Sequence, residues 1–202
     1  MSKKKTRNTK AKIVSAAWKL FYEQGYEATT VEEIIEESGT SRGSFYHYFD
    51  GKDALLSSLS FLFDEEYEAL REEIGEEDDP FEMLMFLNRR LFQMIENRVS
   101  LDLMSRLYST QLVTKGQRHL QDHNRVYFKL LRAIVGRGQE RGVLRSDWTV
   151  NEIVKLYALE ERALIYDWCL CNGDYSLSDY AAKVFPRMME QIRKPAEESE
   201  GR

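Results

Sequence analysis

Apolar residues recur in this chain at the spacing of an α-helix, and this pattern restricts the fold more than any other feature. In the first such segment, about residues 8–24, they fall at positions 13, 16, 17, 20 and 21, which lie on one face of a helix. No segment alternates apolar and polar residues as a half-buried strand does. Only three of the 202 residues are prolines, which break helices. We therefore predict an all-α fold of about nine helices.

Composition narrows the class of protein. The chain is 43% hydrophobic, which is enough to bury a core and argues against a disordered chain. No apolar run approaches the ~20 residues of a membrane helix, and the basic N-terminus is not followed by the apolar stretch of a signal peptide. Cys169 and Cys171 are poorly placed for a disulfide, because positions two apart on a helix point to different faces. We expect a soluble, cytoplasmic protein with reduced cysteines and no contact with a membrane.

The charge is distributed unevenly along the chain. The formal net charge is −5, but residues 1–50 carry 8 basic and 7 acidic side chains. The segment Lys3–Lys12 holds six basic residues and no acidic one. A basic end on an acidic body indicates an N-terminus that faces nucleic acid.

Cap signals divide the first fifty residues into three helices. Gly25 ends the first, and Thr30 with Glu33 forms a capping box that opens the second. Gly39 ends the second helix, and Ser41 can cap a short third helix that reaches about residue 49. Two short helices joined by a brief turn containing glycine form a helix-turn-helix. We predict that residues 1–51 are a DNA-binding domain.

The third helix has an outer face suited to a DNA groove. When Phe45 is placed inward, positions 43, 44, 46 and 47 point away from the core. This face is small, polar and aromatic, and it lacks the Lys and Glu of an ordinary solvated face. Glycine lets a backbone approach closely, and the serine, tyrosine and histidine side chains can contact bases or phosphates.

Residues 9–55 resemble the TetR family of repressors. The resemblance rests on the helix end Phe21–Gly25, the Thr29–Thr30–Val31 entry, the Gly39-x-Ser41-x-Gly43 turn and the segment SFYHYFDGKDAL, which looks like the family's recognition helix running into its fourth helix. It implies a recognition helix in the major groove of a double-stranded operator, with Thr30 and Lys52 on phosphates. The implied DNA-binding residues are Thr30, Arg42, Gly43, Ser44, Tyr46, His47, Tyr48 and Lys52.

The second helix departs from what a DNA-binding surface requires. It carries glutamates at positions 32, 33, 36 and 37. These charges repel phosphates unless they point away from the DNA. We therefore expect affinity to depend on the basic arm Lys3–Lys12.

Residues 52–195 are predicted to form a helical domain for effector binding and dimerisation, followed by a disordered tail at 196–202. The periodicity and cap signals place helices at about 52–74, from 80, from 100, at 117–141, at 149–171 and from 176 or 178 to about 194. The family resemblance is consistent with this helix count. In such proteins an effector alters the spacing of the two recognition helices and lowers operator affinity.

Polar residues interrupt two apolar faces in this second domain. Asn88 and Glu160 are each flanked by apolar residues one turn away, and buried polar groups need partners. Internal partners such as Arg106 or Arg162, or a ligand, would satisfy them. We predict a pocket for an apolar or amphipathic effector of undetermined charge. Its expected lining is Asn88, Leu91, Met104, Tyr108, Tyr127, Leu131, Tyr157 and Glu160.

The last two long helices are the expected dimer interface. They follow one another and carry apolar faces, which would pack with their copies as a four-helix bundle. The expected interface residues are Leu164, Ile165, Tyr180, Val184 and Met188.

Metal, cofactor and catalytic sites are not expected. His119 and His123 have the i, i+4 spacing of metal ligands and Asp122 is near, but no third ligand is obvious. No nucleophilic triad, phosphate loop or paired-carboxylate motif occurs. The favoured interpretation is a homodimeric repressor released from a palindromic operator by a small molecule. An activator, an effector-independent regulator and, from another class, a helical protein-binding adaptor stay open.

Overall fold

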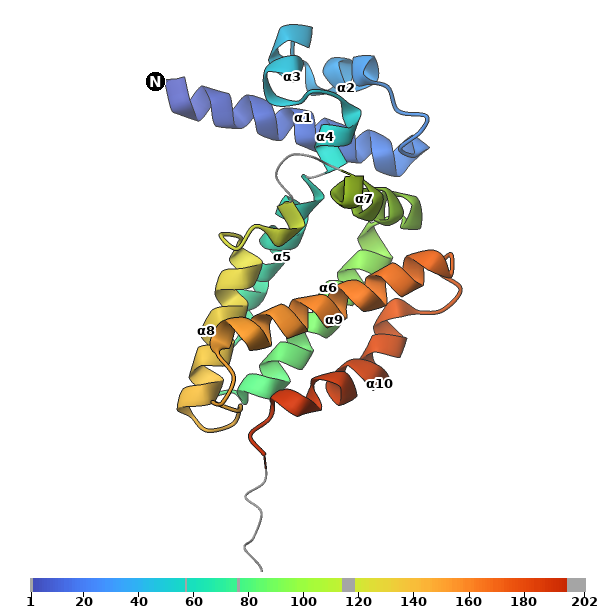
Figure 1. Ribbon diagram of the computed structural model, residues 1–202. Coiled ribbons are helices and arrows are strands. Elements are labelled where there is room, and N and C mark those ends of the chain that lie inside the picture. Colours follow the sequence, from blue (N-terminus) through green and yellow to red (C-terminus); the bar gives the residue numbers. More distant parts are fainter. Residues whose placement is uncertain (1, 57, 76, 114–118, 196–202) are drawn as a thin grey trace, which may run out of the picture. The chain divides into compact units, whose positions relative to one another are not determined.

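The computed structural model describes residues 2–56, 58–75, 77–113 and 119–195, and over these ranges the chain is helical (Figure 1). Apart from one isolated bridge between Leu144 and Arg193, these ranges contain no β-pairing. The all-α prediction is confirmed. The helices are α1 (Ser2–Gln24), α2 (Val31–Ser38), α3 (Arg42–Tyr48), α4 (Lys52–Leu56), α5 (Leu59–Glu73), α6 (Pro80–Arg98), α7 (Leu101–Val113), α8 (Val126–Glu140), α9 (Val150–Leu170) and α10 (Leu177–Met189), with short 3₁₀ turns η1 (His119–Gln121) and η2 (Glu190–Ile192).

The chain forms two compact units. Unit 1 comprises Met1–Leu62 and Val99–Gln121, and unit 2 comprises Phe63–Arg98 and Asp122–Arg202. Helix α7 therefore packs with the N-terminal helices, where it contacts α4. These units do not coincide with the boundary predicted at residue 51, because the packing of α4 and α7 depends on contacts between distant parts of the chain.

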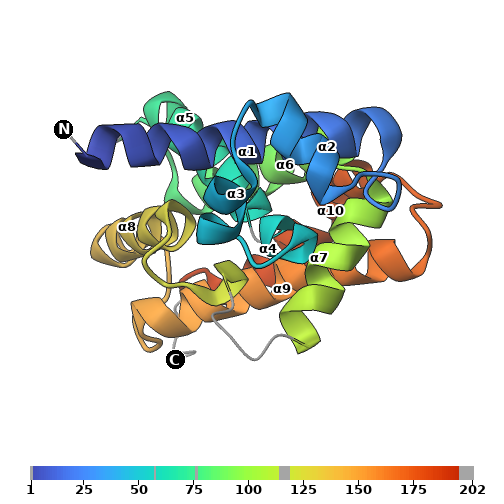
Figure 2. The same cartoon turned by 90° about the horizontal axis from the view of Figure 1, so that it is seen from above.

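The local cap signals of the helix-turn-helix are confirmed. The Thr30 hydroxyl accepts the Glu33 amide at 3.2 Å, and the Glu33 carboxylate accepts the Thr30 amide at 2.7 Å. Gly39 ends α2 with φ of 61°, a left-handed conformation that favours glycine. Ser41 caps α3 by accepting the Ser44 amide at 3.1 Å. Figures 1 and 2 show α2 and α3 along α1, as the packing of both helices against α1 requires.

The first helix begins earlier than the periodicity predicts. Helix α1 starts at Ser2, whereas the sequence indicates a start near residue 8. Most of the basic segment Lys3–Lys12 therefore continues the helical backbone. The side chains of residues 2–8 lie outside the described residues, so the role of this arm stays a prediction.

The predicted helix at 52–74 was wrong as a single helix, because it is divided into α4 and α5. The Ser58 amide and hydroxyl both donate to the Leu55 carbonyl, at 2.9 and 2.5 Å. The same hydroxyl accepts the Trp18 indole N–H at 2.9 Å. Since a serine that bonds to the preceding turn competes with the helical ladder, the chain turns here.

The predicted helix at 117–141 is shorter than expected, because α8 begins only at Val126. The Asp122 carboxylate accepts the Asn124 amide at 2.9 Å, and the Asp122 carbonyl accepts the Arg125 amide at 3.1 Å. These two bonds close a turn before α8. An aspartate that bonds to a nearby backbone amide favours a turn over a continued helix.

Unit 2 is built around four helices. Helices α6 and α9 each pack against both α8 and α10. The Glu96 carboxylate on α6 accepts the amides of Leu177 and Ser178 at 2.6 and 3.0 Å. Because those amides belong to the first turn of α10, the start of α10 is tied to α6.

Candidate nucleic-acid interface and effector site

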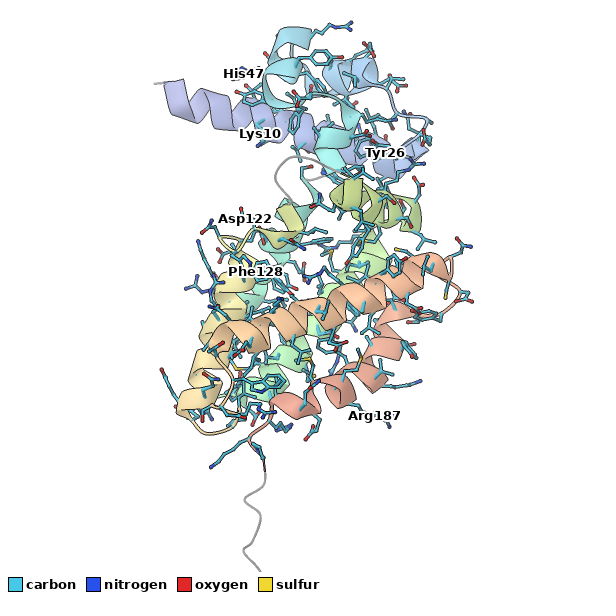
Figure 3. The ribbon with its side chains drawn as sticks, in the orientation of Figure 1. Lys10, Tyr26, His47, Asp122, Phe128 and Arg187 are labelled. Carbon is cyan, nitrogen blue, oxygen red and sulfur yellow. The ribbon has the colours of Figure 1, made fainter. Side chains whose placement is uncertain are left out.

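Helix α3 presents its predicted face outward. Phe45 is completely buried, whereas Gly43, Tyr46 and His47 are exposed. Arg42 is also exposed, and Tyr48 is half-buried. Ser44, which the helical projection places outward, is half-buried as well, and its hydroxyl lies 2.9 Å from the Ser41 hydroxyl. Figure 3 labels His47 on this helix. The geometry therefore makes these side chains available to a groove, and their contact with DNA stays a prediction.

Three of the four glutamates on α2 have partners within unit 1. Glu33 belongs to the capping box, and hydrogen bonds from Thr30 lower the pKa of its carboxyl. Glu37 pairs with Lys19 at 2.7 Å, and Glu32 pairs with Arg42 at 3.3 Å. These ion pairs offset part of the negative charge that sequence analysis identified as unfavourable near phosphates.

Lys52, which the family resemblance places on a DNA phosphate, bonds to backbone carbonyl oxygens of unit 1. Its ammonium donates to the carbonyl oxygens of Tyr26, Thr29 and Glu27, at 2.7, 2.9 and 3.4 Å. It also lies over the Tyr26 ring, 4.3 Å from the centroid. Lys52 therefore holds the loop between α1 and α2 against α4. A phosphate contact by this residue stays a prediction.

Tyr26 is the centre of a polar cluster in unit 1 that sequence reasoning missed. Its side chain is buried, and its hydroxyl donates to Asp53. Burial and the bond to Asp53 raise the pKa of this tyrosine. Arg106 of α7 lies 5.0 Å from the ring centroid and pairs with Glu27 at 2.6 Å. No local pattern could identify this cluster, because its members come from distant segments.

Arg106 was wrong as an expected partner for the polar residues of the second domain. It belongs to unit 1, where it pairs with Glu27 and, at 2.9 Å, with Asp102 one turn away on α7.

A buried polar cluster lies inside unit 2. The Asn88 amide on α6 donates to one oxygen of Glu161 on α9 at 3.0 Å. The Tyr127 hydroxyl on α8 donates to the other oxygen at 2.7 Å. Asn88 and Glu161 are only 2% and 3% exposed. The Tyr157 hydroxyl, on the same face of α9, donates to the Leu84 carbonyl at 2.8 Å. We call Asn88, Tyr127, Tyr157 and Glu161 the polar cluster.

The environment of Glu161 favours its neutral form. Burial raises the pKa of this carboxyl to about 7, although hydrogen bonds from Asn88 and Tyr127 oppose the rise. Burial and the adjacent Glu161 charge also raise the pKa of Tyr127. The cluster therefore places a carboxyl that titrates near neutrality inside an otherwise apolar core.

The buried carboxylate was assigned to the wrong residue by sequence reasoning. Glu160 is only half-buried, and Glu161 is the residue on the inner face of α9. That face also carries Tyr157 and Leu164, four residues before and three residues after Glu161. A step of one residue rotates a side chain by about 100° around a helix, so the neighbouring glutamate points elsewhere.

The other expected lining residues are divided between the units. Leu91 and Leu131 are buried in unit 2. Asn88, Tyr127 and Tyr157, which were also expected to line the pocket, are buried there as members of the polar cluster. Met104 and Tyr108 belong to α7 in unit 1, where Met104 is buried and Tyr108 half-buried. The structure therefore brings Asn88, Tyr127 and Tyr157 together.

The predicted dimer residues lie on different faces. Leu164 and Ile165 are buried within unit 2, so they are little exposed to a partner, and their place in a dimer interface stays a prediction. Tyr180 is 46% exposed, and Val184 and Met188 are half-buried. The exposed large apolar residues of α9 are instead Leu159, Tyr166 and Leu170. Both the inner and the outer face of α9 carry apolar residues, so periodicity alone could not tell which face is exposed. The residues chosen from α9 lie on its inner face.

His119 and His123, the histidines whose spacing is compatible with a metal, are only partly described by the structure. The His119 side chain lies outside the described residues, and the centroid of the exposed His123 ring lies 4.7 Å from that of Phe128. Figure 3 labels Phe128 on α8. Among the described residues, no three His, Cys, Asp or Glu side chains are grouped so that they could hold a metal ion. Within the same residues, no helix is long and apolar enough to span a bilayer.

Two family models match the chain. Residues 13–59 match "Bacterial regulatory proteins, tetR family", and residues 63–191 match "YsiA-like protein, C-terminal region". The first match contains the helix-turn-helix, and the second covers more than half of the chain. The protein belongs to the TetR family of transcriptional regulators. Members of the TetR family are DNA-binding transcriptional regulators rather than enzymes, so the prediction of a DNA-binding regulator is confirmed. The predicted helical fold with an N-terminal helix-turn-helix is confirmed as well.

Relatives of known sequence are HTH-type transcriptional regulators. An HTH-type regulator in the lacX 3′ region of Lactococcus lactis is 48% identical over 46 residues, which are 23% of this chain and 24% of that protein. This relative is therefore matched over about a quarter of its length. The repressor KstR2 of Mycobacterium tuberculosis is 26% identical over 149 residues, covering 72% of this chain and 74% of KstR2.

Solved structures of transcriptional regulators share the fold over almost the whole chain. FadR of Thermus thermophilus, in complex with lauroyl-CoA, has a TM-score of 0.73 at 24% identity and covers 95% of this chain and 99% of its own. FadR of Bacillus subtilis, in complex with stearoyl-CoA, has a TM-score of 0.68 at 20% identity, with 90% and 98% covered.

Proposed function

We propose that this TetR-family protein is a homodimeric repressor, which leaves a palindromic operator when an amphipathic small molecule binds unit 2. The observation that carries the proposal is the polar cluster around Glu161. A buried carboxyl held by neutral donors costs stability relative to an apolar core. Such a cluster at the meeting point of α6, α8 and α9 is therefore better explained by ligand recognition than by stability.

We assign DNA binding to unit 1. The outward face of α3, with Tyr46 and His47 exposed, supports its insertion into a major groove. A two-fold dimer presents two such helices, so the operator is expected to hold two inverted half-sites. Their centres should be separated by one turn of DNA or a multiple of it.

We assign dimerisation to the outer face of α9 and α10. Leu159, Tyr166 and Leu170 on α9 are 53%, 49% and 63% exposed, and Tyr180 on α10 is 46% exposed. Exposed apolar side chains on two helices that pack against each other favour a protein interface. A second copy suits this face, because a two-fold axis sets the same apolar patch of both copies against each other.

We propose a fatty acyl thioester as the class of effector. The two FadR proteins of the same fold hold lauroyl-CoA and stearoyl-CoA. The polar cluster is compatible with this class, because a thioester is uncharged and avoids repulsion by the Glu161 carboxyl. A free fatty acid would place a second carboxylate in the core, where like charges are strongly unfavourable.

The test uses the full-length protein and a duplex selected from random DNA by that protein. Lauroyl-CoA, CoA and lauric acid are added separately, and fluorescence anisotropy and thermal unfolding are measured. Lauroyl-CoA should release the duplex and raise the melting temperature, while CoA and lauric acid should do neither. A ligand at a hundred times its Kd stabilises a fold by about 2.7 kcal/mol.

Two substitutions connect the response to the cluster. Tyr127→Phe keeps the ring and removes the donor to Glu161, and Asn88→Leu removes the second donor. Both should weaken the response to lauroyl-CoA more than they weaken DNA binding. If lauroyl-CoA changes neither the melting temperature nor the anisotropy, the effector class is wrong. If no duplex is selected at all, the repressor assignment fails.

A further inference from the structure

We propose that Glu32 is a positioning residue that directs Arg42 to a guanine in the major groove, so that this ion pair determines DNA sequence specificity. The proposal rests on the DNA binding of the family and on geometry within unit 1. It does not depend on the effector or on dimerisation through α9 and α10.

The arginine is held by two partners on the outer surface. Its Nη1 lies 3.3 Å from Oε1 of Glu32, and its guanidinium carbon lies 5.6 Å from the Tyr46 ring centroid. Arg42 is the first residue of α3, and Glu32 lies in the first turn of α2. The Arg42 and Glu32 side chains are 68% and 64% exposed. The pair therefore lies at the surface where α2 and α3 meet, with the guanidinium confined to one region.

The held arginine retains donors for a ligand. A guanidinium has five N–H donors, so an ion pair through Nη1 leaves others for a bidentate contact. In the major groove, the O6 and N7 acceptors of guanine match this planar fork. Restricting the arginine beforehand also reduces the conformational entropy lost on binding.

The charge of Glu32 favours a base edge over a phosphate. A phosphate at Arg42 would compete with a carboxylate and be repelled by it, because both are anions. Guanine presents neutral acceptors, so the same carboxylate imposes a much smaller cost. Lys19 of the same unit is likewise paired, with Glu37 at 2.7 Å. These two pairs lower the attraction of this surface for DNA of any sequence.

The test compares wild type with Glu32→Gln and Arg42→Ala by selecting binding sites from random duplexes. Arg42→Ala should abolish the preference for guanine at one position of each half-site, a discrimination of roughly 5- to 150-fold. Glu32→Gln should weaken that preference and raise affinity for random-sequence duplex by roughly two- to five-fold. The salt slope of Glu32→Gln should steepen by up to about 0.9, as expected if Arg42 gains a phosphate.

Glu36→Gln is the matched control. Glu36 lies on the same helix and is exposed, and within the described part of the chain it is not paired with Arg42. Glu36→Gln therefore changes the net charge as Glu32→Gln does, but it leaves the ion pair of Arg42 in place. The melting temperatures of all variants should stay near wild type, since the changed side chains are exposed. The proposal is overturned if Glu32→Gln matches Glu36→Gln in base preference and random-duplex affinity. It is also overturned if Arg42→Ala weakens binding to all sequences equally.

Discussion

The hydroxyl of Tyr127 on α8 donates a 2.7 Å hydrogen bond to the carboxylate of Glu161 on α9. This bond joins two helices of unit 2 inside its core, where Tyr127 is 7% and Glu161 3% exposed. Burial raises the pKa of Glu161 to about 7, from a usual value near 4.5. The polar cluster therefore connects protonation to the stability of this unit.

The first prediction concerns pH. Because the folded pKa lies above the unfolded one, the contribution of Glu161 to stability should fall as pH rises from about 4.5 to about 7, and should change little above that. The loss is at most on the order of 3 kcal/mol. Glu161→Gln cannot ionise, and an amide flip of Asn88 can preserve the hydrogen bonds. This variant should exceed wild type in unfolding free energy at pH 8 and match it near pH 4.5.

Urea unfolding followed by circular dichroism at these two pH values provides the measurement. Glu160→Gln is the control, because Glu160 is the adjacent residue on α9 and only half-buried. It should unfold like wild type at both pH values. Equal stabilisation by both variants at pH 8 would show that the effect comes from net charge rather than from the cluster.

A second prediction concerns Lys52. Its ammonium is directed at the carbonyl oxygens of Tyr26, Glu27 and Thr29, so Lys52→Ala should destabilise unit 1 by about 1–3 kcal/mol. A phosphate contact would instead appear in the salt dependence of DNA binding, where its loss lowers the slope by about 0.9. We expect thermal unfolding to change and the slope to stay constant. Lys12→Ala, which removes an exposed lysine from α1, should not change the unfolding. If the Lys52→Ala protein is as stable as wild type and its DNA binding has a reduced salt slope, Lys52 contacts a phosphate instead.

The third prediction concerns the outward face of α3. Replacing Tyr46 and His47 together with alanine should abolish sequence-specific binding, since both side chains are exposed on the candidate groove-facing surface. The melting temperature should stay close to that of wild type, because Phe45 and Phe49 keep the buried contacts. Anisotropy with selected and random duplexes measures the specificity. Unchanged preference for the selected duplex would mean that another surface reads the DNA.

The fourth prediction concerns the dimer. Tyr166→Glu places a charge on the exposed apolar face of α9, where a copy of the same residue should lie nearby. Analytical ultracentrifugation should show monomers, and affinity for a two-half-site duplex should fall in parallel. Tyr22→Glu on α1 changes a tyrosine that is 77% exposed in unit 1, and it should leave the dimer intact. A dimeric Tyr166→Glu protein would exclude this face.

The sequence alone determined the parts of the protein that depend on neighbours a few residues apart. The box between Thr30 and Glu33, the left-handed Gly39 and the Ser41 cap each involve a single turn, so their residues predict the helix-turn-helix directly. The outward face of α3 follows from the same reasoning, since one buried residue, Phe45, sets the rotation of a short helix.

Only the tertiary structure decided which residues of the longer helices are buried and which meet. Trp18 and Ser58 are forty positions apart, and their hydrogen bond lies where a predicted single helix is divided. Asn88 and Glu161 are separated by 73 positions. Periodicity locates an apolar stripe but leaves the rotation of the helix uncertain by about one residue, or about 100°. Glu160 and Glu161 differ by this angle, so periodicity cannot tell which of them points into the core. The rotation of α9 is set by its packing against α8 and α10. These contacts join residues far apart in the chain, so the local sequence of α9 does not reveal them.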